Sequence, residues 1–465
     1  MGLNIFGTLN TAAQGMTAQQ VGLNVTGQNV ANVNTDGYSR RMVELSPMPG
    51  PPTGGGGVEV EGIKRYTDQF ATARLVQENG NFGSADERSQ ILAHVAELFN
   101  DIQDGGLGSA FDNFFGSIRL LESSPNDATV RQEVLARAQE LSSTFNRVSN
   151  EVESVRVNID NVLRSSAANI NLSTSEIAKL NDTISMGLVK GQDVSDLQDR
   201  RDNLIQSVSE EVSIKYFEDE TGKVSVFLQG GPPLVEGIYQ SELFVNDMAV
   251  PGGAAVQYRS SNGQVTDVTS NIEGGRLGGA LDVRDNTIPG FADDLDQLAY
   301  DFITAVNAQH SAGFGLDGVG GRNMFEPVGA VAGAASAMTL STDVAGVPDN
   351  IAAADDPAML PGDNRNALAM ADLVEQPLTG GGTITFGQGY SNLVGNVGVE
   401  ARRSNDEASL RAASRDNIKT IRDSSTGVSL DEEMTNLIKY QRAYQASARV
   451  LSVIDEAIQA LLSLK

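Results

Sequence analysis

The sequence contains no cysteine and no tryptophan, and only two histidines, His94 and His310. The absence of cysteine excludes disulfides, zinc–thiolate sites and thiol nucleophiles. Aromatic residues make up only 5% of the chain, which is low for a large enzyme and usual for long helices that pack through aliphatic side chains. A chain without cysteine also suits a protein that works outside the cell without disulfides.

Positive charge is also scarce. The chain has 33 basic residues against 60 acidic ones, a net charge of −27, and such a surface repels phosphate. We therefore expect no nucleic-acid partner and no membrane insertion, and no apolar run approaches the eighteen or so residues of a membrane-spanning helix. The start, "MGLNIFGTLN", lacks the basic and apolar regions of a Sec signal peptide, so a route out of the cell would involve no cleavage.

Catalytic motifs are missing as well. The sequence has no G-x-S-x-G, and His94 lies in a helical pattern without the H-E-x-x-H spacing. The acidic pairs Asp293–Asp294 and Asp355–Asp356 are expected by chance among sixty carboxylates, and adjacent residues on a helix do not face each other. We predict no catalytic residue, cofactor or metal. The alternative, a secreted acidic enzyme acting on glycans, requires a cleft with two carboxylates at a defined separation.

Both ends of the chain carry apolar residues every seven positions. These residues are Leu9, Met16, Leu23 and Val30 near the start, and Leu430, Leu437, Tyr444, Leu451 and Ile458 near the end. Such a repeat is typical of coiled-coil helices, whereas the termini of most proteins fray. We predict that the two ends pair as an antiparallel hairpin and that these nine residues form an interface for assembly with copies or relatives of the chain.

The pattern between the ends predicts a mainly α fold with an inserted β domain. Residues 126–186 read as one long helix or two in line, with Asn126 as the N-cap, and residues 276–311 as helix with a break at Pro289. Residues 312–388 show no clear pattern. We expect terminal coiled-coil helices (1–34 with 428–465), an elongated helical-bundle body domain (35–211 with 273–427) and a small β-rich outer domain (212–272).

The stretch "ANVNTDGYSRR" (31–41) ends the first helix. Asn32, Asn34 and Gly37 are helix-ending and turn residues, and Gly37 suits a positive φ. Tyr38 can pack its ring while its hydroxyl stays in water, and Arg40 is a positive charge in an acidic protein. These five residues are predicted to form a joint between a terminal helix and the body. The alternative is an ordinary loop.

Several motifs carry a family resemblance. "NVANVNTDGYSRR" (29–41) and the C-terminal "GVSLDEEMTNLIKYQRAYQASARVLSVIDEAIQALL" resemble the terminal segments of bacterial flagellar axial proteins, that is, rod, hook and hook-associated proteins. Within that group, "GYSRR", "GGVEVEGIKRYTDQFATARL", "VNAQHSAGFGLDG" and "PGDNRNALAMADL" are similar to the hook-associated protein 1 family. The resemblance is thin over 212–272 and 325–360. The chain is short for that family, which implies a reduced outer domain.

This resemblance implies a structural protein of the flagellum, located outside the cell at the junction of hook and filament. The terminal helices would form an inner tubular layer, with the body outside it and the β domain projecting outward. The implied partners are copies of the chain in a ring-like zone, hook protein below, hook-associated protein 3 above, and a cytoplasmic export chaperone on the C-terminal region. Export would use the flagellar type III apparatus without cleavage.

Two further alternatives remain at this level. The chain could be a hook or distal rod protein, and those proteins polymerise along a length. It could also be a coiled-coil adhesin, a class that normally carries a Sec signal.

Overall fold

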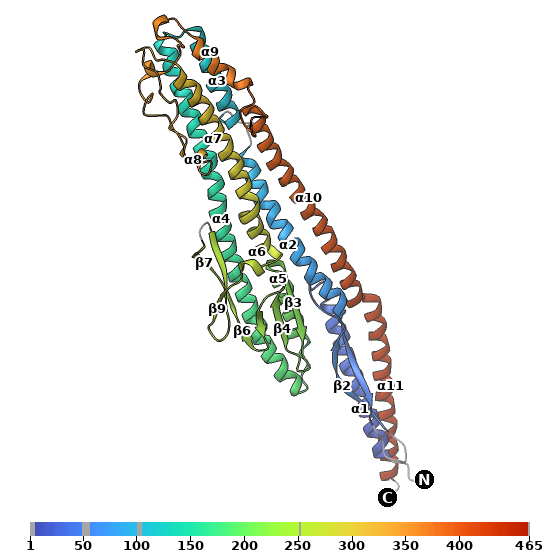
Figure 1. The fold of residues 1–465 in the computed structure, drawn as a ribbon. Coiled ribbons are helices and arrows are strands. Elements are labelled where there is room, and N and C mark those ends of the chain that lie inside the picture. The colour runs from blue at the N-terminus through green and yellow to red at the C-terminus, as the bar shows by residue number, and fades with distance from the viewer. Residues whose placement is uncertain (1–4, 49–55, 100–104, 251–252, 464–465) are drawn as a thin grey trace.

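The longest element of the structure is α4 (Ala128–Val189), a single helix of 62 residues. At 1.5 Å per residue it is about 90 Å long and runs along most of the body. The computed structural model describes residues 5–48, 56–99, 105–250 and 253–463 (Figure 1). Asp127, rather than the predicted Asn126, caps α4, because its carboxylate accepts hydrogen bonds from the backbone N–H groups of Thr129 and Val130.

In the described part of the chain, ten further α-helices surround α4 or extend beyond it. They are α1 (Ile5–Ala31), α2 (Gln69–Leu98), α3 (Leu107–Ser123), α5 (Ser195–Glu211), α6 (Gly275–Asp282), α7 (Ile288–Ala312), α8 (Ala334–Ala337), α9 (Arg365–Asp372), α10 (Phe386–Thr426) and α11 (Leu430–Ser463). The predicted break near Pro289 is a π-helical turn, Val283–Thr287, that precedes α7 and leaves Pro289 in its first turn. Proline lacks a backbone N–H, and the change in hydrogen-bond pattern at the π turn is where the continuous helical run from α6 to α7 accommodates it.

Strands occupy two places in the chain. β1 (Arg41–Pro47) and β2 (Val58–Arg65) form an antiparallel hairpin directly after α1. Seven more strands lie between α5 and α6: β3 (Ile214–Glu218), β4 (Val224–Leu228), β5 (Pro233–Glu236), β6 (Tyr239–Gln240), β7 (Glu242–Val250), β8 (Gly253–Arg259) and β9 (Val265–Asp267). They form a four-stranded sheet, β3–β4–β5–β6, and a three-stranded sheet, β7–β8–β9.

Both of these sheets lie along α4. Asn181 of α4 donates hydrogen bonds to the carbonyls of Val224 and Gly237, and Asn171 donates to the carbonyl of Leu243. The predicted mainly α fold with an inserted β region is therefore confirmed. The division into three domains with the predicted boundaries stays a proposal.

The body has an aromatic core where α3, α7 and α10 meet α4. Phe302 of α7 is fully buried, and its ring lies 5.2 to 6.0 Å, centre to centre, from the rings of Phe111, Phe114, Phe115, Phe325 and Phe386. Most of these pairs meet edge to face, the arrangement that the charge distribution of aromatic rings favours. This cluster ties helices from three parts of the sequence to one point.

The irregular segment after α7 is held by buried polar side chains. The guanidinium of Arg131 is fully buried and donates to the backbone carbonyls of Pro125, Pro348 and Ile351. Burial lowers the pKa of Arg131 to about 10. Fixed by anchors of this kind, the segment needs no repeating apolar pattern, which explains why residues 312–388 could not be assigned from sequence.

His310 provides a second anchor, and it makes stability depend on pH. Its Nδ1 lies 2.8 Å from the carbonyl oxygen of Arg322, and its Nε2 accepts a hydrogen bond from the backbone N–H of Ala352 at 3.0 Å. Both ring nitrogens of the neutral imidazole therefore have a hydrogen-bond partner. Burial lowers the pKa of His310 from 6.5 to about 4. Since the unfolded chain takes up the proton first, the free energy of unfolding should fall by about 1.4 kcal/mol per pH unit as pH drops from 6.5 to 4.

Denaturant unfolding at pH 7 and at pH 4 measures this effect. Carboxylates elsewhere titrate in the same range, so the comparison is with His310→Gln, which cannot titrate. The wild-type chain should lose about 3 kcal/mol more than the variant over this interval. Equal losses in both proteins would show that His310 is not buried in its neutral form.

Candidate assembly interface and joint

The two ends of the chain form an antiparallel pair of helices, α1 and α11, as predicted (Figure 1). The register is regular, because facing residues advance by seven along α1 and recede by seven along α11. The facing pairs are Gly15 with Ser447, Gly22 with Tyr440, and Asn29 with Glu433. The heptad repeats at the two ends therefore belong to one structural unit, which we call the terminal hairpin.

Glycine allows these two helices to approach closely. A Cβ atom on Gly22 would lie 2.7 Å from the ring of Tyr440, which is shorter than any ordinary contact. The ring thus occupies the space that a side chain at position 22 would need. Glycine costs roughly 1 kcal/mol relative to alanine within a helix, so its presence in α1 is explained by this close packing.

The stripe predicted on α1 is not the one that faces α11. Ala18, Val25 and Asn29 are buried in the hairpin, whereas the predicted Leu9, Met16, Leu23 and Val30 are half-buried. Successive residues of a helix are about 100° apart, so Leu23 lies about 140° around the helix from Ala18. A role for the predicted stripe in contacts between copies stays a prediction.

The stripe predicted on α11 does face α1 over most of its length. Four of its residues are half-buried in the hairpin: Leu437, Tyr444, Leu451 and Ile458. Leu430, at the N-terminal end of α11, is exposed. The same face also carries Glu433 and Ile454, which are buried. Their part in assembly is likewise still a prediction.

Asn29 is the polar centre where the terminal hairpin meets the body. Its side chain is 1% exposed and makes four hydrogen bonds. The amide nitrogen donates to the carbonyl of Arg41 at 2.9 Å and to Glu433 Oε2 at 3.1 Å. The amide oxygen accepts from the Tyr38 hydroxyl at 2.9 Å and from the Arg41 N–H at 3.0 Å. Asn29 therefore fixes the end of α1 to the first strand and to the start of α11.

Arg40 connects four elements at the same place. Its backbone N–H donates to the carbonyl of Thr426 at the end of α10, and its carbonyl accepts from the N–H of Tyr66 after β2. Its guanidinium binds Glu433 at 2.8 Å and also pairs with the exposed Glu432. Since Glu433 is almost fully buried, its negative charge depends on Arg40 and Asn29 for stabilisation.

Arg41 extends the joint towards the body. Its guanidinium is buried, pairs with Asp196 and Asp199 of α5, and lies 4.9 Å above the centre of the Tyr38 ring. Burial alone lowers the pKa of Arg41, but the bond to Asp196 and the neighbouring charges raise it overall. Burial also raises the pKa of Tyr38. Both side chains thus keep their usual protonation states and act as fixed parts of the joint.

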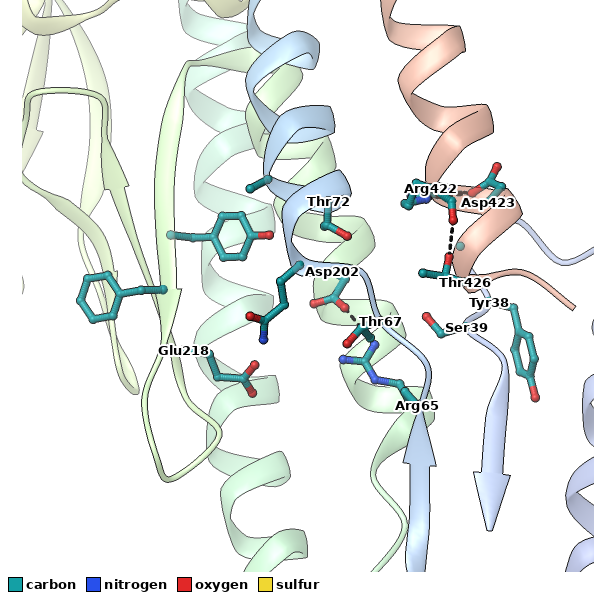
Figure 2. Close-up of a pocket in the computed structure, with 15 residues that line it drawn as sticks. Tyr38, Ser39, Arg65, Thr67, Thr72, Asp202, Glu218, Arg422, Asp423 and Thr426 are labelled. Carbon is teal, nitrogen blue, oxygen red and sulfur yellow. Dashed lines mark hydrogen bonds and ion pairs between the residues drawn. The ribbon is translucent and has the colours of Figure 1, made fainter. Parts of the chain in front are cut away.

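A polar cavity of about 420 Å³ lies behind these contacts (Figure 2). Arg65 of β2 reaches into it and binds Asp199 at 2.7 Å and Asp202 at 2.8 Å, while Arg422 and Thr426 of α10 line another wall. Burial raises the pKa of Asp202, and attraction to Arg65 opposes that rise. Tyr38 also lines this cavity, and its hydroxyl donates to Asn29.

The five residues predicted for the joint have different environments. Gly37 has φ of +76°, and a Cβ atom there would lie 2.2 Å from the side chain of Asn203 on α5, so only glycine fits. Asn32 bonds within the turn that ends α1, to Gln28 and Thr35. Asn34 is exposed. The structure therefore brings Gly37, Tyr38 and Arg40 together and leaves Asn34 outside.

Other residues of the joint were missed by sequence reasoning, namely Asn29, Arg65, Asp199 and Glu433. One signal could have found Asn29, because Gly15, Gly22 and Asn29 are seven residues apart and repeat as regularly as the leucines. A small or polar residue at such spacing indicates a face that meets another helix closely. The partners on α5 had no such signal, because their role depends on the tertiary fold.

Among the described residues, no group of three or more potential metal ligands occurs. Comparisons with known proteins identify the class of protein to which the chain belongs. Residues 92–325 match the family model of the flagellar hook-associated protein FlgK helical domain. Residues 9–38 match that of the flagella basal body rod protein, and residues 423–464 match that of the flagellar basal body rod FlgEFG protein C-terminal region.

Whole-chain similarity agrees with these matches. The flagellar hook-associated protein 1 of Bacillus subtilis is 27% identical over 98% of this chain and 97% of its own length. That of Escherichia coli K12 is 24% identical over 98% and 99%. The structure of the flagellar hook junction protein FlgK from Burkholderia pseudomallei has the same fold, with a TM-score of 0.68 at 17% identity, covering 77% of this chain and all of the other. The chain belongs to the FlgK family of flagellar hook-associated proteins.

Proposed function

We propose that this chain is a structural junction subunit that joins the flagellar hook to the filament, and that its copies assemble through the terminal hairpin. The FlgK family is a family of structural flagellar proteins and not of enzymes, and its members belong to the flagellum. Among the described residues, no helix is both long and apolar enough to span a membrane. Copies of the chain, hook protein and hook-associated protein 3 are the proposed partners in the assembled flagellum.

The distribution of charge is the observation that supports this proposal most directly. Residues 1–34 and 428–465 contain five acidic and four basic residues, a net charge of −1 out of −27 for the whole chain. The remaining residues therefore carry almost all of the negative charge. Copies can bring their terminal hairpins together without strong repulsion, while the acidic bodies remain in water.

Export and the chaperone are further parts of the proposal. The terminal hairpin presents half-exposed apolar residues, including Leu430, Met434 and Ile438 at the start of α11. A helix with such a surface benefits from a protective partner before assembly. We therefore propose that a cytoplasmic chaperone covers the C-terminal region, and that the chain leaves the cell through the flagellar type III apparatus without cleavage.

Leu437→Asp tests the terminal hairpin. The substitution places a carboxylate in the α1–α11 contact, and burying an unpaired charge there is costly. We expect the variant to keep the circular dichroism and unfolding midpoint of the body while it fails to bind the distal ends of isolated hooks. The amount bound, measured by electron microscopy with labelled protein, should fall by about tenfold or more.

The matched control is Leu410→Asp. Leu410 lies on α10 and is 68% exposed, so the same chemical change leaves the terminal hairpin intact. This variant should bind hooks like the wild-type chain. If Leu437→Asp also bound normally, the terminal hairpin would not be the assembly element.

A second candidate is another flagellar axial protein of the hook or distal rod. It is favoured by the terminal matches to rod proteins and by the hook protein FlgE of Rhizobium meliloti, which is 38% identical over 15% of this chain. Such proteins would form long polymers. The helical-domain match over residues 92–325 favours the junction instead.

A further inference from the structure

One face of α11 has no partner among the residues that the structure describes. Met434 and Ile438 are 50% and 45% exposed, and Arg442 is exposed as well. Because residues four apart lie on the same side of a helix, these three form one continuous face. Tyr440 packs against Gly22 of α1, and Ile438 lies about 160° around α11 from Tyr440, so this face is turned away from α1.

The β1–β2 hairpin also presents a face that no described residue covers. Met42, which is 46% exposed, and Glu44 alternate along β1 on that face, and Glu59 lies opposite Ser46 on β2. Lys64, opposite Met42, completes it. The face therefore carries a methionine and a lysine at one end and two glutamates further along.

The charged side chains on the two faces have opposite signs and, among the described residues, form no ion pairs. Within the described part of the chain, Arg442 forms no ion pair, and neither do Glu44 and Glu59. Most other arginines of the molecule pair with a carboxylate, including Arg40, Arg41 and Arg65 of the joint. On α11, two exposed apolar side chains lie beside the unpaired Arg442. On the hairpin, the exposed Met42 lies beside two unpaired glutamates, so the two faces are complementary.

The two faces also lie at similar distances from the joint, measured along the terminal hairpin. Asn29 binds both Glu433 and Arg41, which sets a common level for α11 and β1. Arg442 is nine residues further along α11, about 14 Å at 1.5 Å per residue. Glu44 is three residues beyond Arg41 along β1, a distance of about 10 Å. Ser46, which pairs with Glu59, is five residues beyond Arg41, a distance of about 17 Å. Arg442 thus lies at a height between the two glutamates.

We propose that the α11 face of one copy, Met434, Ile438 and Arg442, docks on the outer face of the β1–β2 hairpin of a second copy, Met42, Glu44 and Glu59. Within one chain, α11 and the β1–β2 hairpin pack against different sides of α1, so the contact joins separate copies (Figure 1). Two different patches meet, and repetition of such a contact closes into a ring when the rotation allows it. The inference rests on the proposed assembly at the hook and names the contact between its copies.

Engineered disulfides test the contact directly, because the wild-type chain has no cysteine. Ser46 and Gln445 lie on the two faces at similar heights and carry no charge. The double variant Ser46→Cys with Gln445→Cys, assembled on isolated hooks and oxidised mildly, should give a ladder of covalent multimers. Each single variant should remain monomeric, and so should the double variant when free and dilute. Hook-bound double variant that yields no ladder would overturn the proposal.

Charge reversal gives an independent test. Arg442→Glu should reduce hook-tip binding by about tenfold, since it places like charges together. Combining it with Glu44→Arg and Glu59→Arg should restore binding. The matched control is Arg402→Glu, the same charge reversal at an exposed arginine of α10 outside the terminal hairpin, and it should bind like the wild-type chain.

These tests separate the contact from the proposed function. If the wild-type chain does not bind hooks at all, the junction function fails, and the contact inferred from it falls too. If the wild-type chain binds and Arg442→Glu binds equally well, only the contact between copies is wrong.

Discussion

Replacing Asn29 with leucine is expected to lower the free energy that fixes the terminal hairpin to the body by about 3 to 6 kcal/mol. Leucine has nearly the same shape as asparagine but makes no hydrogen bond. The substitution leaves the Arg41 N–H and carbonyl, the Tyr38 hydroxyl and Glu433 without the partner that they share. Each buried group that loses its partner costs about 1 to 3 kcal/mol, partly offset where water can enter.

Native-state hydrogen exchange measures this loss directly, because the Arg41 amide is itself a donor to Asn29. Its protection should fall by about a hundredfold or more, at tenfold for each 1.4 kcal/mol. The matched control is Asn34→Leu, the same change at an exposed position five residues later, which should alter protection by less than about 0.5 kcal/mol. Unchanged protection of Arg41 in the Asn29 variant would show that this network does not hold the joint.

Replacing Phe302 with alanine should destabilise the body by about 3 to 5 kcal/mol. The ring is fully buried and contacts five other phenylalanines from three other segments of the chain, so its removal leaves a cavity that no single side chain can fill. Chemical denaturation followed by circular dichroism gives the free energy of unfolding.

Phe217→Ala is the control for this core. Phe217 stacks on Phe227 with ring centres 5.4 Å apart but is 58% exposed. Its loss should cost about 1 kcal/mol, mainly the ring contact. If the two substitutions cost the same, the cluster around Phe302 would not be the centre of the core.

The parts of the fold that could be predicted from sequence are those with a long periodic signal. The pattern over residues 126–186 predicted one long helix or two in line, which is α4, and the repeats at both ends predicted the antiparallel terminal hairpin. The change to β-branched and aromatic residues near 212 predicted the inserted strands. A buried helical face or strand imposes its period on many residues, so these features survive errors at single positions.

Only part of the joint could be predicted from the sequence. Gly37, Tyr38 and Arg40 were identifiable because turn residues, an aromatic ring and a rare positive charge occur together. Their partners on α5 and α11, such as Asp199 and Glu433, are more than 150 residues away along the chain. With sixty carboxylates in the sequence, no local pattern distinguishes the few that pair with an arginine in the joint.

The stripe predicted on α1 does not face α11, and sequence reasoning could not foresee this for a different reason. Sequence reasoning selected Leu9, Met16, Leu23 and Val30 because large apolar residues usually mark the buried face. In the hairpin, the face towards α11 instead carries Gly15, Ala18 and Gly22, because Tyr440 and the other large residues of α11 occupy the space. Close packing of a large side chain on a small one is a property of the pair, and neither helix shows it alone.

The central claim is that the terminal hairpin assembles this chain into a short zone at the distal end of the hook. The most direct test is to add the purified chain to isolated hooks with bare distal ends and to image them by electron microscopy. The proposed function predicts a thin new zone at the distal tip that does not grow further. Long polymers would contradict it and place the chain with hook or rod proteins, and an absence of any binding would show that the terminal hairpin is not an assembly element.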